Sequence, residues 1–240
     1  MSDKTTIYLI PGLGAGSEIF EYLSLPEDRF EVHSLEWLIP ESENESLESY
    51  TIRMAASVKE KMPVLIGVSF GGVLAQEMSK LFPTKKVIII SSLKKRSELP
   101  KRLKLLQKLG LYKLLPTRRI SKIDDFSRFN FHQTVKRKAE LYNRYMRVRN
   151  EKYLNWAIET VLHWKGDGNT PDLVHIHGTR DEIFPIKYIE NCRKNPSVRI
   201  ANLVLAKRMA MPTITGTIET LTSPTTVCII ENDGALSCTK

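Results

Sequence analysis

Short apolar runs alternate with amphipathic segments of helical spacing over the first 92 residues of the chain. Apolar runs of roughly four to eight residues, bounded by glycine, proline or charged residues, are typical of strands. Their alternation with helical patterns favours parallel strands joined by helices. The predicted strands are residues 7–10, 30–35, 64–68 and 86–91. The predicted helices are residues 17–23, residues 46–61 and a segment that ends near residue 82.

The alternation stops for about 75 residues after residue 92. This segment contains amphipathic helical patterns at residues 101–109, 135–149 and 153–163, and no strand pattern. A helical insertion into a series of strands and helices is most simply a cap over the carboxyl edge of the sheet. The series resumes with a predicted strand at residues 173–177.

We interpret the chain as a single α/β domain with a mostly parallel sheet. Its 240 residues, of which 42% are hydrophobic, can bury a sizeable core. We assign the core to residues 1–92 and 170–205, an all-helical cap to about 93–169, and an atypical tail to about 198–240. The last 40 residues contain 8 threonines against 9 in the first 200, and the only strand expected there is at residues 198–205.

The sequence argues against several classes of protein. No apolar stretch reaches about 18 residues, so no membrane-spanning helix is expected, and the apolar run near the N-terminus is too short for a secretory signal. The three cysteines, Cys192, Cys228 and Cys238, are odd in number and lack metal-ligand spacing. We expect a soluble, cytoplasmic protein without a disulfide framework or a metal site.

The net charge of +9 is concentrated in the predicted cap. Residues 94–165 contain 20 Lys and Arg against 6 Asp and Glu, whereas the other residues contain 16 against 21. This distribution argues against a nucleic-acid partner and favours a basic module within an enzyme. The cap could steer an anionic substrate, such as an acyl thioester on a phosphorylated carrier. A solvated face is the favoured alternative, and contact with an anionic membrane surface is the less favoured one.

Residues 67–71, Gly-Val-Ser-Phe-Gly, match the pattern G-x-S-x-G between a predicted buried strand and a helix. A serine hydroxyl is a weak nucleophile unless a sharp strand-to-helix turn presents it rigidly to a base. Small residues two positions before and after the serine let the strand and the helix approach each other. We therefore predict that Ser69 is a nucleophile; the alternative is a glycine-rich turn that only packs.

The loop after the first strand, Pro11-Gly12-Leu13-Gly14, supplies the second element of a site. Acyl transfer needs two N–H donors directed at the developing oxyanion. We predict that these are the N–H groups of Leu13 and of Phe70, which follows the nucleophile directly. A phosphate-binding loop is disfavoured, because the run has neither the Lys-Ser/Thr of a P-loop nor a complete G-x-G-x-x-G.

Asp181 follows the predicted strand at residues 173–177 and lies 112 positions after Ser69. A carboxylate beyond a strand end can orient an imidazole and stabilise its protonated form. We predict that Asp181 is such an acid.

On these residues the chain resembles the α/β-hydrolases that carry an inserted helical cap. The resemblance covers about residues 6–192, four-fifths of the chain, and depends on residues 7–14, GVSFGG at 67–72 and HGTRDEIFP at 177–185. It implies a sheet of about six strands and a catalytic histidine after the last strand, near residues 206–211. It also implies the roles given above: Ser69 as nucleophile, Asp181 as triad acid, and Leu13 with Phe70 as the oxyanion hole.

No histidine follows Asp181 in this chain, so the general base is not identified. His177 lies near the expected site, but a histidine before the glycine of this motif is usually structural. His163 and His132 belong to the predicted cap, and His33 and His175 belong to predicted strands. One hypothesis is that the tail has been replaced or read in another frame, because its altered composition coincides with the missing base.

The function that we predict is serine-dependent hydrolysis of a carboxylic ester or thioester through an acyl-enzyme, impaired by the missing histidine. This reaction needs no cofactor. The alternative is a catalytically inactive, hydrolase-like protein that binds a ligand.

Overall fold

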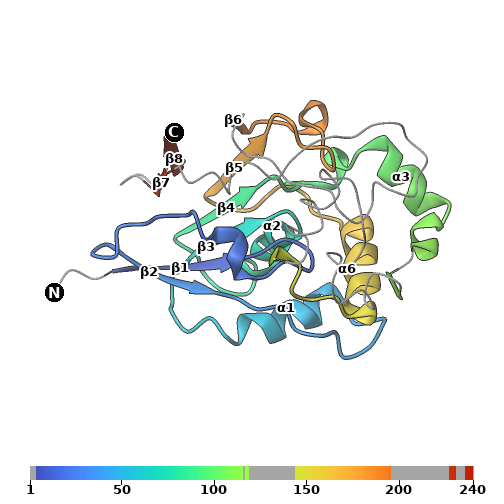
Figure 1. Ribbon diagram of the computed structural model, residues 1–240, viewed down its shortest axis with the longest axis horizontal. Helices are drawn as coiled ribbons and strands as arrows, with labels where there is room; N and C mark the ends of the chain where they lie inside the picture. The colour runs from blue at the N-terminus through green and yellow to red at the C-terminus, as the bar shows by residue number, and fades with distance from the viewer. Residues whose placement is uncertain (1–3, 116, 119–143, 196–226, 231–235, 240) are drawn as a thin grey trace, which may run out of the picture.

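The computed structural model describes residues 4–115, 117–118, 144–195, 227–230 and 236–239. Six parallel strands form one sheet in the order β2-β1-β3-β4-β5-β6 (Figure 1). The strands are β1 (Thr5–Ile10), β2 (Phe30–Ser34), β3 (Val64–Val68), β4 (Lys86–Ile90), β5 (Leu173–Gly178) and β6 (Arg193–Asn195). The prediction of a parallel sheet of about six strands is therefore confirmed.

Both faces of this sheet are covered, which explains the wholly apolar sequence of its central strands. Alternate side chains point to opposite faces, so Leu65 and Ile89 join one hydrophobic cluster while Ile66 and Ile88 join another. The first cluster includes residues of α1 (Leu47–Ala55) and α2 (Phe70–Met78). The second includes Phe20 at the end of the 3₁₀ helix η1 (Ser17–Phe20).

The helix α1 begins as predicted and ends earlier than predicted. The Ser46 side chain accepts a hydrogen bond of 3.0 Å from Ser49 N, which caps the first turn. The pattern predicted helix to residue 61, but α1 ends at Ala55. The ladder tightens there, since Ser57 N and Val58 N donate to carbonyl groups three residues back, and Lys59 N then donates to the Tyr8 hydroxyl of β1.

The described part of the insertion is helical and lies beyond the carboxyl edge of the sheet (Figure 1). It contains η2 (Arg96–Glu98), α3 (Lys101–Lys108), η3 (Leu111–Leu114) and α6 (Glu151–His163). A complete cap over residues 93–169 stays a prediction, because residues 116 and 119–143 lie outside the described residues. Most of the helix predicted at 135–149 also falls there; of its described residues 144–149, residues 144 and 145 are helical and 146–149 are not.

The carboxyl end of the chain differs from its prediction. The sixth strand, β6, lies at residues 193–195 and was not predicted, because a three-residue polar edge strand has no hydrophobic pattern. The strand predicted at 198–205 lies outside the described residues. The tail contributes an antiparallel pair, β7 (Val227–Ile230) and β8 (Leu236–Thr239). Among the described residues, no helix has the length and apolar character needed to cross a membrane.

Candidate active site

Ser69 occupies the turn between β3 and α2 with a strained backbone. Its φ is 53° and its ψ is −116°, a combination that L-residues rarely adopt. The turn is fixed from both sides: Ser69 N donates to Ile90 O at 2.9 Å, and the Ser92 hydroxyl donates to Ser69 O at 2.7 Å. The Ser69 residue stays partly exposed. This conformation is the one that the G-x-S-x-G pattern requires of its serine.

The glycines around Ser69 are needed because backbones meet there. A Cβ atom at Gly67 would overlap the backbone of Gly71, and a Cβ atom at Gly71 would overlap the carbonyl groups of Ile10 and Pro11. The strand, the helix and the loop after β1 thus touch without side chains between them. A Cβ atom at Gly12 would instead meet Ser69 Cβ at 3.7 Å, which is an ordinary contact.

The loop after β1 is tied to the rest of the protein on two sides. The Trp37 ring nitrogen donates to Gly12 O at 3.0 Å, and Gly14 N donates to the Tyr153 hydroxyl of α6 at 3.2 Å. Within the described residues, no backbone or side-chain acceptor takes the N–H of Leu13. The N–H of Phe70 opens α2 and so has no acceptor within that helix. Neither N–H group is therefore committed to an acceptor by the contacts of the described residues.

Sequence reasoning missed Trp37 and Tyr153, which hold the loop that carries Leu13. Trp37 stacks on Phe70 with ring centroids 5.2 Å apart, and Tyr153 is completely buried. An aromatic residue that supports a loop has the same sequence pattern as one that fills a core, so no signal distinguished these two. The aromatic residues Trp156 and Trp164 of the insertion likewise belong to the hydrophobic core.

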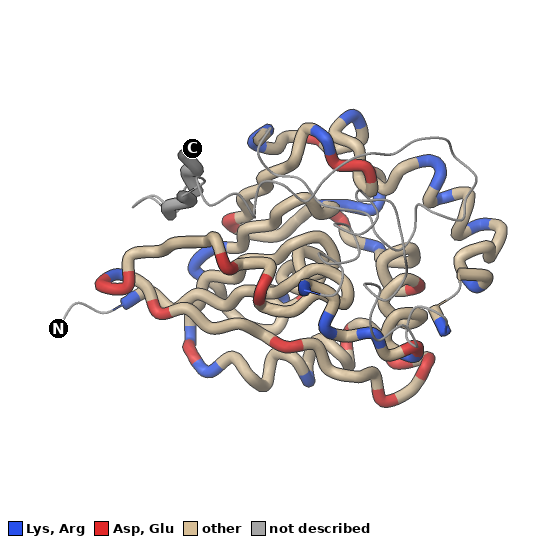
Figure 2. The backbone as a smooth tube through the Cα atoms, viewed as in Figure 1, with Lys and Arg blue, Asp and Glu red and all other residues tan. Residues whose placement is uncertain are grey.

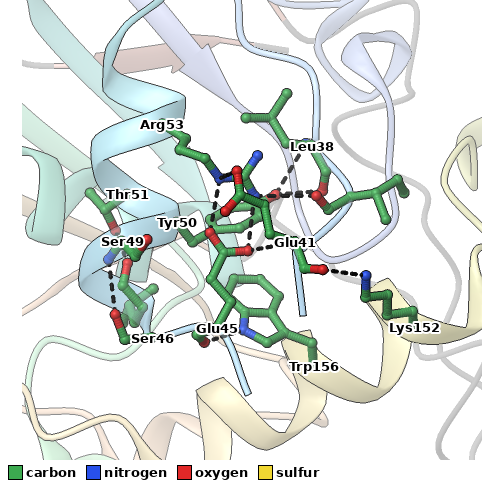
Figure 3. A network of polar contacts seen from close by, with 12 residues as sticks. Leu38, Glu41, Glu45, Ser46, Ser49, Tyr50, Thr51, Arg53, Lys152 and Trp156 are labelled. Atoms are coloured by element: carbon green, nitrogen blue, oxygen red, sulfur yellow. Dashed lines mark hydrogen bonds and ion pairs between the residues drawn. The ribbon is translucent and has the colours of Figure 1, made fainter. Parts of the chain in front are cut away.

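A polar network holds α6 in place over α1 (Figure 3). Arg53 of α1 donates to both carboxylate oxygens of Glu45, at 2.8 and 2.9 Å. The backbone carbonyl of Glu45 accepts from the Trp156 ring nitrogen at 2.8 Å, and Lys152 Nζ donates to Glu41 O at 2.8 Å. These contacts fix the helix that presents Tyr153 to the loop after β1.

Asp181 lies just beyond the end of β5 and is almost fully buried. Its Oδ1 atom accepts hydrogen bonds from Ile183 N at 2.8 Å and Phe184 N at 2.9 Å. Its Oδ2 atom is buried and has no hydrogen-bond partner among the described residues. Burial raises the pKa of this carboxyl to about 6, against the lowering effects of the two backbone N–H groups and of the nearby Ser91 hydroxyl. Oδ1 is thus committed to two N–H groups, whereas Oδ2 has His177 Nε2 as a neighbour at 3.5 Å.

Ser69 and Asp181 lie at the same edge of the sheet with one strand between them. Ser69 follows β3, Asp181 follows β5, and β4 pairs with both of these strands. Two strand spacings amount to about 10 Å, too far for a direct hydrogen bond between the two side chains. A group of intermediate size, such as an imidazole, is needed to connect them.

His177 does not provide that connection. Its Nε2 atom lies 2.7 Å from Phe184 O, and its Nδ1 atom lies 3.1 Å from His175 Nε2. A neutral ring satisfies both contacts when Nε2 donates to the carbonyl and Nδ1 accepts from His175. Burial lowers the pKa of His177, and burial together with the neighbouring ring lowers the pKa of His175 to about 3. Both histidines are thus neutral, buried and engaged.

The other described histidines contact neither Ser69 nor Asp181. His33 of β2 lies 3.1 Å from Glu31, and His163 at the end of α6 contacts Glu159 O and the Tyr112 ring. His132 lies outside the described residues. Among the residues that the structure places, no group of three His, Cys, Asp or Glu side chains could hold a metal ion.

The fold defined by this sheet, its covering helices and the turn at Ser69 is the α/β-hydrolase fold. Neither a family model nor a curated protein matches the sequence. The structure is similar to a protein of Mycobacterium tuberculosis H37Rv assigned as a non-heme bromoperoxidase, with a TM-score of 0.57, 14% identity and coverage of 81% of this chain and 84% of that one. It is also similar to an esterase of Exiguobacterium antarcticum, with a TM-score of 0.52, 14% identity and coverage of 81% and 84%.

Proposed function

We propose that this protein is a serine hydrolase that acts on a carboxylic ester or thioester through an acyl-enzyme. The observation that carries this proposal is the strained Ser69 at the turn between β3 and α2. Such strain persists only where the surrounding structure enforces it, and it is concentrated at functional sites. The similarity of the fold to that of an esterase is consistent with the proposal.

The proposed chemistry assigns a role to each group. The Ser69 hydroxyl attacks the acyl carbon, and the N–H groups of Phe70 and Leu13 stabilise the negative charge that develops on the acyl oxygen. The alcohol or thiol leaves with a proton, and water then releases the acid from Ser69. Asp181 would orient and stabilise an imidazole that carries this proton in both steps.

A fluorophosphonate probe tests whether Ser69 is an activated nucleophile. We expect the wild type to be labelled and Ser69→Ala to remain unlabelled. The matched control is Ser57→Ala, because Ser57 is an exposed serine after α1, remote from the turn. Labelling of Ser69→Ala at the wild-type rate would contradict the proposal.

A second function, ligand binding without turnover, is favoured by one observation. Asp181 Oδ2 is buried without a well-formed hydrogen bond among the described residues, since the nitrogens of His177 have other partners. A hydrolase body that lacks its base can still hold an acyl group against Leu13 and Phe70. If the wild type is labelled no faster than Ser69→Ala, while binding an ester or thioester analogue reversibly, this second function is the correct one.

A further inference from the structure

The outward face of α3 and η3 exposes leucines in a segment that is otherwise basic. Four leucines within ten residues have between 42% and 77% of their surface exposed: Leu105, Leu109, Leu111 and Leu114. Scattered exposed leucines are common in proteins, but several exposed leucines this close along the chain are typical of an interaction surface. We call these four residues the leucine face.

The orientation of α3 explains why its leucines divide into two sets. At about 100° per residue, Leu103 and Leu106 point to one side of the helix, and Leu105 points to the opposite side. Leu103 and Leu106 pack against Tyr112 and the residues of α6, whereas Leu105 and Leu109 are more than half exposed. The sequence pattern predicted an amphipathic helix at residues 101–109, but leucines lie on both faces of α3.

The charge of this surface has one sign. Residues 99–118 contain six Lys and Arg and no Asp or Glu. The nearest acidic residue before them, Glu98, is completely buried and accepts from Lys94 N and Glu190 N. In Figure 2 the outer rim formed by α3 and η3 carries basic positions without an acidic one. Lys101 and Lys108 are exposed on the outer part of α3 beside the leucine face.

We propose that the leucine face and the lysines beside it dock on the surface of an anionic lipid bilayer. Apolar side chains that enter the headgroup boundary, flanked by cations that remain at the lipid phosphates, are the chemistry that such a surface recognises. A nucleic acid would use the charge and leave the leucines in water. A second copy of the chain would oppose like charges. This proposal does not depend on the proposed function, since it concerns a surface and not the chemistry at Ser69.

Sedimentation with vesicles tests the proposal on the full chain. We expect binding to vesicles of phosphatidylcholine mixed with phosphatidylserine, little binding to phosphatidylcholine alone, and a loss of binding as salt rises. The variant Leu105→Ser/Leu109→Ser should weaken binding at least about tenfold. The variant Lys101→Gln/Lys108→Gln should weaken it about 30-fold, because each cation near such a surface contributes about fivefold.

Matched controls come from the region around α1. Ile52→Ser/Met62→Ser removes two apolar side chains of similar exposure, and Lys59→Gln/Lys61→Gln removes two exposed lysines. Both controls should bind vesicles like the wild type. Because all the changed side chains are exposed, circular dichroism should show folded protein in every case.

Three results would overturn the proposal. The first is equal sedimentation with both kinds of vesicle, or equal weakening by the control variants. The second is retention on heparin that depends on Lys101 and Lys108 without vesicle binding, which would indicate a polyanion partner. The third is a lipid-free dimer that the leucine variant dissociates, in the absence of vesicle binding by the wild type.

Discussion

His177 Nε2 lies 3.5 Å from Asp181 Oδ2, and both side chains are almost entirely inaccessible to solvent. This separation is longer than a well-formed hydrogen bond, and His177 Nε2 has a closer acceptor in Phe184 O at 2.7 Å. The His177 imidazole therefore bonds to the backbone beyond β5 and does not connect Asp181 to Ser69.

Replacement of His177 distinguishes a structural role of its imidazole from a role as the general base. We expect His177→Asn to lower the free energy of unfolding by about 2 kcal/mol, because it removes buried hydrogen bonds at both ring nitrogens. Any Ser69 labelling should keep its rate under conditions where the variant is folded. Urea unfolding and fluorophosphonate labelling measure the two effects, and His33→Asn at the sheet edge is the control. A variant of wild-type stability that has lost labelling would identify His177 as the base.

Asp181→Asn should stabilise the protein at neutral pH. The pKa of Asp181 is raised from 3.8 to about 6 in the folded state, so folding favours its protonated form. The cost of the buried charge is absent below pH 4, develops as pH rises through about 4 to 6, and is complete above that window. The neutral amide should remove a cost on the order of 3 kcal/mol above pH 6 and change little at pH 4.

Urea unfolding of the two proteins at pH 4 and pH 7.5 measures this difference. A comparison of the wild type alone at the two pH values would mix two opposing effects. As pH decreases, protonation of Asp181 increases stability, whereas the lowered pKa of His175 makes stability fall below about pH 6.5. A stabilisation by Asp181→Asn that is equal at both pH values would contradict the role of the carboxyl charge.

The contacts around Ser69 predict that the protein tolerates alanine at Gly12 but not at Gly71. Gly71→Ala should destabilise the protein by about 3 kcal/mol or more, because its Cβ would overlap the backbone at Ile10 and Pro11. Gly12→Ala should change stability by less than about 1 kcal/mol, since its Cβ meets Ser69 Cβ at 3.7 Å. Thermal unfolding of both variants tests this order, and equal losses would contradict it.

Tyr153→Phe should disturb the loop that carries Leu13. The variant leaves the buried Gly14 N–H without its acceptor, at a cost of about 1–2 kcal/mol in stability. A shift of this loop should slow Ser69 labelling by up to about 100-fold. Tyr112→Phe is the control, because it removes a tyrosine hydroxyl that bonds Glu159 at the opposite end of α6. Similar slowing in both variants would exclude a specific effect on the loop.

The sequence predicted the parts of this protein that follow from local patterns. Strands β1, β3 and β4, the turn at Ser69 and the position of Asp181 beyond β5 all depend on runs of neighbouring residues. The contacts that decide chemistry depend on residues distant along the chain, such as the Tyr153 hydroxyl at Gly14 N and the Phe184 carbonyl at His177. No local pattern encodes these contacts.

The part of the chain that the structure describes gives Asp181 Oδ2 no well-formed hydrogen bond, which leads to a last prediction on the proposed hydrolase. If an imidazole is what the site lacks, free imidazole should bind beside Asp181 and accept the proton of Ser69. A general base that is held in position accelerates a reaction by about 100- to 10,000-fold. Imidazole from solution should recover part of this acceleration, roughly tenfold in the rate of Ser69 labelling.

The acceleration should saturate with imidazole concentration and rise with pH as imidazole loses its proton. It should vanish in Ser69→Ala and weaken in Asp181→Asn, because an amide oxygen cannot stabilise the imidazolium as a carboxylate does. Triazole, a much weaker base of the same shape, provides the control for binding without proton transfer. Equal acceleration of wild type and Asp181→Asn would mean that imidazole acts from solution, and that Asp181 does not serve as the orienting acid.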